Sequence, residues 1–147
     1  MDDSIDLDAV KAFVTALSPW AHIATVGADG KPDVVPVHPC WDGDTLWTML
    51  GSSSVKAKNV ADNPNVALHW QVTENGDGVE VWGTAELFDD VETKKRLWDG
   101  VFDYDLNAFA PGGPENSPDT AFLAVTPERA LILKQYGMQG LQRWSAS

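Results

Sequence analysis

Small hydroxyls and positive charges gather in one short stretch of an otherwise acidic chain. Ser52, Ser53 and Ser54 follow a glycine, and Lys56 and Lys58 come shortly after them, although the 147-residue chain has a formal net charge of -12. If a helix begins at these serines, its first N–H groups lack partners and carry about half a positive charge. Such a helix start binds phosphate readily. The alternative is a serine that only caps the helix, with lysines that face solvent.

Two further residue types that do chemistry lie close together at His38 and Cys40. Imidazole is a common proton donor near neutral pH, so His38 is a candidate donor, with a partly buried, hydrogen-bonded histidine as the alternative. Cys40 has no recognisable base beside it and is interpreted as a small core residue. His22 and His69 fall in other segments, and the spacing of the three histidines predicts neither a metal nor a haem site.

Length and composition predict a single domain over residues 1–147. The hydrophobic fraction of 44% and seven tryptophans are enough for a packed core, and one cysteine excludes an internal disulfide. The excess of acidic residues argues against nucleic acid and anionic membranes as partners, because both attract basic surfaces. No apolar run approaches the ~20 residues of a membrane span, and no targeting signal is recognised, so a cytoplasmic protein is expected.

The elements that position these residues are mostly strands. Apolar residues at helical spacing predict a helix over residues 4–17, capped by Asp6 and ended by Pro19. A second helix is predicted from Ser53 or Ser54 to about Asp62, and a third over 91–102 after a cap at Asp89 or Asp90. Strands are predicted at 22–26, 32–41, 45–50, 66–72, 79–88, 120–127 and 129–137. Tight turns between them predict a small, mostly antiparallel barrel.

Two segments stand outside this pattern. Residues 103–119 are rich in Gly, Pro, Asn and Asp, and irregular segments of this length in compact domains are often lids or partner-contacting arms. Residues from about 138 onward are predicted to be a flexible tail with two hydrophobic anchors, Leu141 and Trp144.

Four motifs follow one another along the chain: ATV…DGKP…PV (24–37), WDGDTLW (41–47), S-x-K-x-x-N-x-x-x-N-P-x-V-A-L (54–68) and V-x-V-x-G-T-A-E (79–86). Together they resemble the pyridoxamine 5'-phosphate oxidase-like family, in its general stress protein and flavin or deazaflavin oxidoreductase branch, over about residues 7–137. The resemblance implies a mainly β fold with flanking helices, a six-stranded antiparallel Greek-key split β-barrel. It also implies a homodimer with cofactor grooves at the dimer interface.

The same resemblance gives the serine and lysine stretch a role. It implies that FMN binds with its phosphate at the helix start and its ring along the backbone of two neighbouring strands. Trp144 is added because an aromatic residue on the tail would cover the ring of the partner's cofactor. The candidate cofactor-binding residues are Val35, Pro36, Val37, His38, Thr48, Met49, Leu50, Ser53, Ser54, Lys56, Lys58, Gln71 and Trp144.

The sequence departs from the family pattern around the phosphate. Asp33, Val34 and Val35 stand where many members carry an arginine, and Val55 precedes the matched lysine where oxidases proper often have arginine. The C-terminal signature of a true pyridoxamine phosphate oxidase is absent, so vitamin B6 synthesis is not predicted.

The predicted function is an FMN-dependent oxidoreductase that transfers a hydride to or from a small or aromatic substrate. Since the cofactor carries the chemistry, no catalytic triad is needed. One alternative is a reductase of the same fold that uses the deazaflavin coenzyme F-420, whose acidic tail prefers a longer basic groove. A second alternative is a flavin-binding stress protein without turnover.

Overall fold

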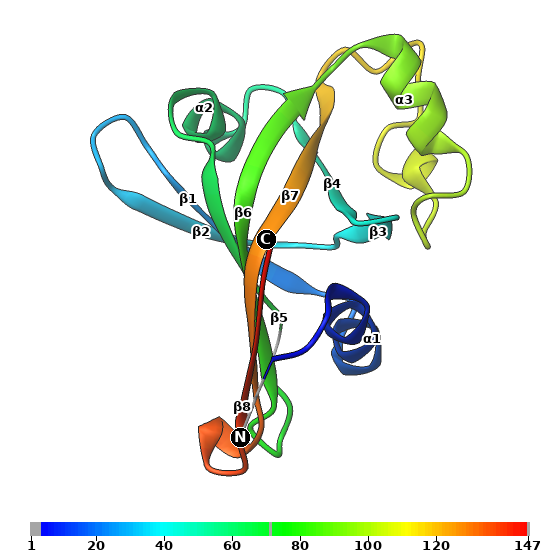
Figure 1. Cartoon of the computed structure of the whole chain (residues 1–147). Helices are drawn as coiled ribbons and strands as arrows, with labels where there is room; N and C mark the ends of the chain where they lie inside the picture. Colours follow the sequence, from blue (N-terminus) through cyan, green and yellow to red (C-terminus); the bar gives the residue numbers. More distant parts are fainter. Residues whose placement is uncertain (1–3, 71, 147) are drawn as a thin grey trace.

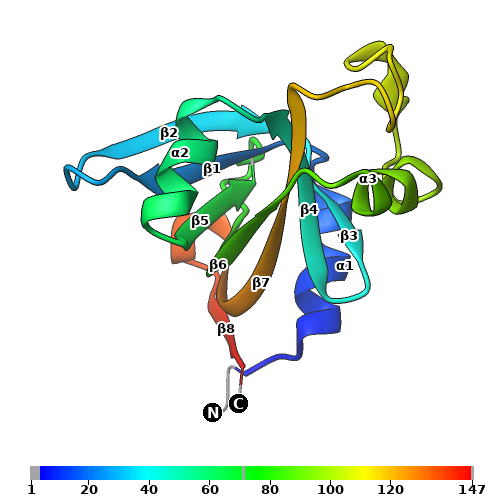
Figure 2. The same cartoon turned by 90° about the horizontal axis from the view of Figure 1, so that it is seen from above.

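The computed structural model describes residues 4–70 and 72–146, which form one sheet with helices around it (Figures 1 and 2). The strands are β1 (Ala21–Val26), β2 (Pro32–Val37), β3 (Cys40–Asp42), β4 (Thr45–Gly51), β5 (Asn65–Trp70), β6 (Gly78–Phe88), β7 (Thr120–Leu133) and β8 (Leu141–Ser145). The α-helices are α1 (Leu7–Leu17), α2 (Val55–Asp62) and α3 (Val91–Trp98), with short 3-10 helices η1 (Leu106–Ala108) and η2 (Gln135–Gly137). Within the described ranges, every helix is too short or too polar to cross a membrane.

The strands pair in the order β2-β1-β5-β6-β7-β4-β3, and β8 pairs with β7 beside this path. Each of these strand pairings is antiparallel. Six strands, β1, β2, β4, β5, β6 and β7, are six residues or longer. They curl around a common core (Figure 1), which confirms the mainly β, antiparallel split barrel; β3 and β8 are short additions to it.

The strand β7 replaces two predicted strands, and the predicted break at Glu128 is wrong. Proline cannot donate a ladder hydrogen bond, which is why Pro127 looks like the end of a strand in the sequence. In the fold, Gly83 of β6 pairs with Pro127, whereas the preceding Trp82 pairs with Arg129. Glu128 is therefore the extra residue of a β-bulge, and the strand continues past the proline.

The last residues form a strand, so the prediction of a flexible tail is also wrong. β8 lies alongside β7 (Figure 2), with Trp144 opposite Ala130. The backbone N–H of Ile5 donates to the carbonyl of Arg143 at 3.1 Å, which holds the N-terminal segment against the same strand. Trp144 packs against the interior of the barrel, as expected of a hydrophobic anchor.

The barrel interior, which we call the barrel core, is filled by aliphatic side chains and one tryptophan. Its largest members with less than 2% of their surface exposed are Trp70, Ile23, Leu46, Leu68, Leu123, Ile132, Val10, Val79, Val81 and Val125. Helix α2 adds Ala57 and Val60 to it. The alternation of apolar and polar residues along the strands is what directs one face of each strand into this core.

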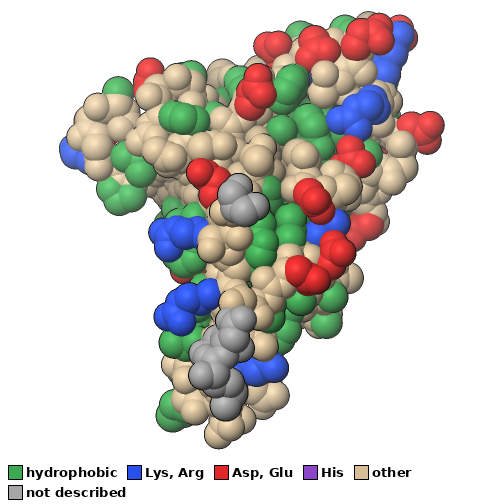
Figure 3. Space-filling view, viewed as in Figure 1, with side chains coloured by type: hydrophobic (Ala, Val, Ile, Leu, Met, Phe, Trp, Pro, Cys, Tyr) green, Lys and Arg blue, Asp and Glu red, His purple; other side chains and the backbone are tan. Residues whose placement is uncertain are grey.

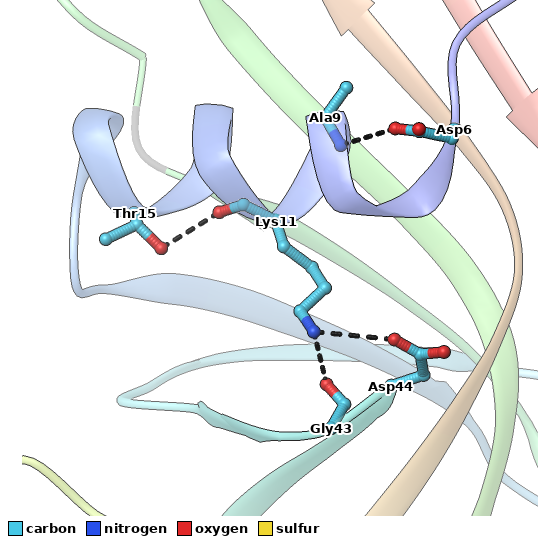
Figure 4. A network of polar contacts seen from close by, with 6 residues as sticks. All are labelled: Asp6, Ala9, Lys11, Thr15, Gly43 and Asp44. Atoms are coloured by element: carbon cyan, nitrogen blue, oxygen red, sulfur yellow. Dashed lines mark hydrogen bonds and ion pairs between the residues drawn. The ribbon is translucent and has the colours of Figure 1, made fainter.

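Helix α1 packs against the barrel core, and polar contacts stabilise its first turn and its position on the barrel (Figure 4). Asp6 accepts a hydrogen bond from the N–H of Ala9 at 2.8 Å, which confirms the predicted cap. Lys11 Nζ donates to the carbonyl oxygen of Gly43 at 2.6 Å and lies 3.4 Å from Asp44 Oδ1. The lysine thus fastens the helix to the turn between β3 and β4.

A second apolar cluster lies outside the barrel, where α3 and the segment after it cover β4 and β7. Its buried members are Trp47, Leu97, Leu106 and Phe122, and we call it the loop cluster. Helix α3 begins at the predicted cap, since Asp90 accepts from the N–H of Thr93 at 3.0 Å, but it ends at Trp98 rather than at Phe102. Figures 1 and 2 show this part of the chain standing beyond the ends of the barrel strands.

One buried lysine holds the long irregular segment onto α3. Lys94 is only 3% exposed, and its Nζ donates to the carbonyl oxygen of Ser117 at 3.0 Å. The neighbouring Lys95 is exposed and makes a 3.1 Å ion pair with Glu115 of the same segment. Residues 103–119 are therefore attached to the helix at their far end rather than extending freely into solvent.

Candidate cofactor pocket

One pocket lies between β4, the corner that joins β2 to β3, and the 103–119 segment. Its volume is about 610 Å³, which is within the range of ligand sites. It is lined by Trp20, His38, Met49, Leu50, Gly51, Tyr104, Phe109, Asp119 and Thr120. The lining is largely apolar and aromatic, which suits a flat organic ring.

Strand pairing explains why these distant segments meet. Gly51, at the end of β4, pairs with Thr120, at the start of β7. The next backbone N–H, that of Ser52, donates to the carbonyl oxygen of Asp119 at 2.8 Å. The last residues of the long segment are therefore fixed beside the turn that leads into α2, and the pocket ends where that turn begins.

The aromatic wall is built around Tyr104. Its ring lies over the imidazole of His38 with centroids 4.4 Å apart, and it meets the ring of Phe109 edge-on at 5.7 Å. The Tyr104 hydroxyl donates to the backbone carbonyl of His38 at 3.4 Å. Burial raises the pKa of Tyr104 well above its usual range, so the phenol stays protonated and neutral at physiological pH.

His38 faces a carboxylate and a thiol on its other side. His38 Nε2 lies 2.8 Å from Asp103 Oδ1, close enough for an ion pair, although the ring N–H is not aimed at that oxygen as a hydrogen bond requires. Cys40 Sγ donates to the same oxygen at 3.4 Å. Burial raises the pKa of Cys40 to about 11, and the charge of Asp103 adds to this. The thiol is thus protonated at neutral pH and a poor nucleophile.

The helix start predicted from the serine and lysine stretch exists. Ser54 is the N-cap of α2 and accepts from the N–H of Ala57 at 3.3 Å, so its hydroxyl serves the helix itself. Ser53 is exposed, Lys56 is half-buried and Lys58 is exposed. The first turn of α2 therefore offers one free hydroxyl, two ammonium groups and its own N–H groups to an anion.

The asparagine of the same motif has a structural role that the sequence analysis did not assign. Asn59 Nδ2 donates to Thr25 Oγ1 at 3.0 Å, and Thr25 is buried in β1. This bond orients α2 on the barrel and thereby sets the direction of its N-terminus.

The structure brings some of the candidate residues together and separates others. His38, Met49 and Leu50 line the pocket, and Ser53, Ser54, Lys56 and Lys58 follow it directly along the chain. Val37 and Thr48 are buried next to these, Val35 packs on the barrel core and Pro36 is exposed on β2. Trp144 lines a different pocket with Trp82, Arg129 and Arg143, of about 300 Å³. Gln71 lies outside the described residues.

Sequence reasoning missed six residues of the pocket: Trp20, Gly51, Tyr104, Phe109, Asp119 and Thr120. Three of them belong to the 103–119 segment, for which the sequence predicts a lid or a contacting arm but no residue roles. Its aromatic residues in a stretch otherwise rich in Gly, Pro, Asn and Asp were the available signal, because exposed aromatic side chains in loops often contact ligands or partners.

Comparison with known proteins places this arrangement in a family. The family model described as pyridoxamine 5'-phosphate oxidase matches residues 7–134. The chain belongs to the pyridoxamine 5'-phosphate oxidase family. The match includes the barrel strands, all three helices and the 103–119 segment. No curated protein matches the chain.

Solved structures share the fold of this family member. A protein related to general stress protein 26 from Clostridium acetobutylicum has a TM-score of 0.77 and 19% identity, over 96% of both chains. An FMN-binding protein related to pyridoxamine 5'-phosphate oxidase from Nostoc punctiforme has a TM-score of 0.72 and 16% identity, over 97% of both chains. An F-420 reductase has a TM-score of 0.58 and 26% identity, over 78% of this chain and 90% of that chain.

The residues present fit a phosphorylated flat ring in their apolar surface and hydrogen-bond donors, but one acidic side chain reduces the positive charge near the phosphate. Apolar side chains from Trp20, Met49 and Phe109 offer surface to a ring, and the α2 start offers donors to a phosphate. Asp119 also lines the pocket beside Gly51, so an acidic group lies at the end nearest the lysines. The pocket and the adjoining helix start therefore offer apolar surface and hydrogen-bond donors with little surplus of positive charge.

Proposed function

We propose that this chain is a flavin-dependent oxidoreductase that binds FMN in the pocket beside β4. One observation carries the proposal: the aromatic-lined pocket of about 610 Å³ ends at Gly51, three residues before the N-cap of α2. A ring in the pocket would therefore place its phosphate near a helix N-terminus, where N–H groups and the helix dipole favour an anion.

Bound there, the flavin supplies hydride transfer, and the residues of this chain supply position and protons. Tyr104, Phe109 and Trp20 exclude water from the ring. Ser53 and Lys56 bind the phosphate. His38, held between the ring of Tyr104 and the carboxylate of Asp103, is the proposed proton donor to a small or aromatic substrate.

A homodimer completes the pocket in this proposal. Trp20 is 58% exposed and Phe109 is 70% exposed, although both line the pocket. Exposed aromatic residues around a pocket are typical of a surface that another chain covers. Molar mass by light scattering tests this point, with a value of twice the chain's 16.0 kDa as the expected result.

A second candidate cofactor is coenzyme F-420. The observation that favours it is the 26% identity to an F-420 reductase. Lys56 and Lys58 would then hold the phosphate, and the acidic tail would extend beyond them. Absorption spectra separate the two cofactors, because a deazaflavin lacks the two visible bands of FMN.

A fluorescence titration tests the proposal. Trp20 lines the pocket, so binding of FMN is expected to quench tryptophan emission. If the phosphate is recognised, FMN binds more tightly than riboflavin, and Lys56→Ala removes most of that difference. A charged hydrogen bond of about 1.5–3 kcal/mol corresponds to a loss of roughly 10- to 150-fold in FMN affinity.

The matched control is Lys31→Ala, which removes an equal charge from the exposed turn between β1 and β2. Its affinity for FMN should equal that of the wild type. Equal binding of FMN and riboflavin, or an equal loss in both variants, would contradict a phosphate site at α2. Turnover with a reductant and a dye acceptor then distinguishes an enzyme from a flavin-binding stress protein.

A further inference from the structure

Three metal-binding side chains meet at the corner between β2 and β3. His38 and Cys40 flank a single proline, and Asp103 reaches them from the start of the long segment. The imidazole nitrogen, the thiol sulfur and a carboxylate oxygen all lie within 4.8 Å of one another. We propose that His38, Cys40 and Asp103 bind a divalent transition metal of the zinc type.

The distances between the three side chains fit tetrahedral coordination of one ion after a small movement of Asp103. Bond lengths of about 2.3 Å to sulfur and about 2.1 Å to nitrogen or oxygen place tetrahedral ligands about 3.4–3.6 Å apart. Cys40 Sγ and Asp103 Oδ1 are 3.4 Å apart already. His38 Nε2 and Asp103 Oδ1 are 2.8 Å apart, so this pair must open by roughly 0.6 Å. Asp103 is two-thirds exposed, and its side chain is free to make that shift.

One of these atoms lacks a partner that satisfies it. His38 Nε2 is buried and makes no hydrogen bond within the described chain, despite its short distance to Asp103. A buried ring nitrogen without a hydrogen bond costs free energy. A metal ion between Nε2 and the carboxylate would give the nitrogen a ligand bond and increase the distance between the two side chains.

Charge also favours a cation here. Asp103 has no Lys or Arg within ion-pair distance among the residues that the structure describes. On binding, the Cys40 proton leaves to solvent, so the ion with its two charges meets one thiolate and one carboxylate, and the bound site is neutral. A neutral site is compatible with a partly buried corner. Figure 3 shows acidic and basic side chains interspersed at the end of the molecule that carries α3, so the local charge that favours a cation is that of Asp103 itself.

The ligand set selects the metal and leaves one position open. Thiolate and imidazole prefer zinc, cobalt or copper to magnesium or calcium. Three protein ligands leave a fourth position for water or a small molecule. Cys40 and Asp103 line a second pocket of about 300 Å³, separate from the proposed flavin pocket, so an ion and its fourth ligand have an entry path there. Bound metal would join the 103–119 segment to the barrel.

The other two histidines provide the control. His22 and His69 are opposite each other on β1 and β5, and His69 is opposite Glu80 on β6. Their ligand atoms are not within the same short distance of one another. The group of His22, His69 and Glu80 contains no sulfur ligand, and its affinity for metal should be weak.

Metal binding to the full chain without flavin tests the inference. After treatment with a chelator, Zn²⁺ is titrated against a chromophoric chelator, and Co²⁺ is followed by absorption. One ion per chain is expected, with a thiolate-to-cobalt charge-transfer band that disappears in Cys40→Ser. Asp103→Asn is expected to weaken Zn²⁺ binding by more than roughly 10- to 100-fold, which is the loss expected for a residue that only hydrogen-bonds to a metal ligand. The double variant His22→Gln/His69→Gln should bind like the wild type.

Several results would overturn the site: a cobalt complex without the sulfur band, Zn²⁺ affinity unchanged in Asp103→Asn, or binding lost in the double histidine variant. Circular dichroism checks that each variant is folded. Because Asp103 is exposed, Asp103→Asn keeps the test valid even if Cys40→Ser fails to fold. The readout needs no turnover, so it stands apart from the proposed oxidoreductase activity. In the metal-bound chain His38 is a ligand, and the proton for the substrate then comes from solvent.

Discussion

The barrel core and the loop cluster both bury their side chains, but they are built from different kinds of chain. The barrel core joins residues of regular strands through long runs of backbone pairing, as between β6 and β7. The loop cluster joins α3 and an irregular segment to the outer faces of β4 and β7 through side-chain packing, and the backbone bond from Ser52 to Asp119 lies only at the end of that segment. Three of the six pocket residues outside β4, namely Tyr104, Phe109 and Asp119, come from that irregular segment.

This difference suggests a division of roles. A region held by side chains opens at lower free energy than a region held by a ladder of backbone bonds. The barrel would then provide a rigid wall, with Met49 and Leu50 on it, while the segment with Tyr104 and Phe109 provides a wall that moves when a ligand enters. The following variants compare the two regions directly, from the largest expected effect to the smallest.

Two matched leucines give the largest contrast. Leu68 in the barrel core is 1% exposed and Leu97 in the loop cluster is 0% exposed. Leu68→Ala should lower the free energy of unfolding by about 2–5 kcal/mol, with FMN affinity unchanged in the folded protein. Leu97→Ala should lower the free energy of unfolding of the whole protein less than Leu68→Ala does, and it should weaken FMN binding more. Urea unfolding and the fluorescence titration measure both, and equal behaviour of the two variants would contradict the division.

Two adjacent lysines give the next contrast. Lys94→Met removes the charged donor to the buried carbonyl of Ser117, which keeps only the N–H of Thr120, and loss of this charged hydrogen bond should cost about 1.5–3 kcal/mol in the stability of the 103–119 segment. Lys95→Met removes only an exposed ion pair and should change little. Hydrogen exchange of residues 103–119 is the measurement, and it should accelerate in Lys94→Met alone. Faster exchange throughout the barrel strands would show that the segment is not an independent unit.

Two adjacent serines separate folding from binding at α2. Ser54→Ala removes the N-cap and should lower the free energy of unfolding by about 1 kcal/mol. Ser53→Ala, at an exposed position, should leave stability unchanged and reduce the preference for FMN over riboflavin. Thermal unfolding and the two titrations measure these effects. If Ser53→Ala and wild type prefer FMN equally, the Ser53 hydroxyl has no role in phosphate binding.

Cys40, at the corner between the two regions, gives the smallest effect on stability at neutral pH, because its contribution changes only at alkaline pH. Its folded pKa of about 11 lies above its ordinary value of 9.0 because of burial. The stability that the neutral thiol contributes is therefore complete below pH 9 and is lost as the pH rises through about 11. Unfolding free energies should fall more steeply over this window in the wild type than in Cys40→Ala. Rapid alkylation of Cys40 at neutral pH in the folded protein would contradict its burial.

The sequence predicts the barrel well because its information is local. The alternation in residues 79–88 and the turn at Asp29 and Gly30 define strands and a hairpin without knowledge of their partners. The same local rules misplace a break at Pro127, because a β-bulge depends on the register of the neighbouring strand, and they miss β8, whose partner lies on β7.

The pocket is predicted only in part for the same physical reason. The α2 start follows from its serine cap and Met49 is implied by the family resemblance, whereas Tyr104 and Phe109 lie in a segment without periodicity. The contact of Asp103 with His38 joins residues far apart in the sequence. No spacing rule relates them, and only the folded corner shows that the histidine and the thiol share a carboxylate.

Hydrogen exchange with and without FMN tests the central claim most directly, namely that the pocket beside β4 binds the flavin with its phosphate at α2. The account predicts slower exchange in residues 49–58 and 103–120 with FMN, a smaller effect over 53–58 with riboflavin, and no change in β8. Protection confined to β8 and the adjoining part of β7 would contradict it, because the ligand would then occupy the pocket lined by Trp82 and Trp144 instead.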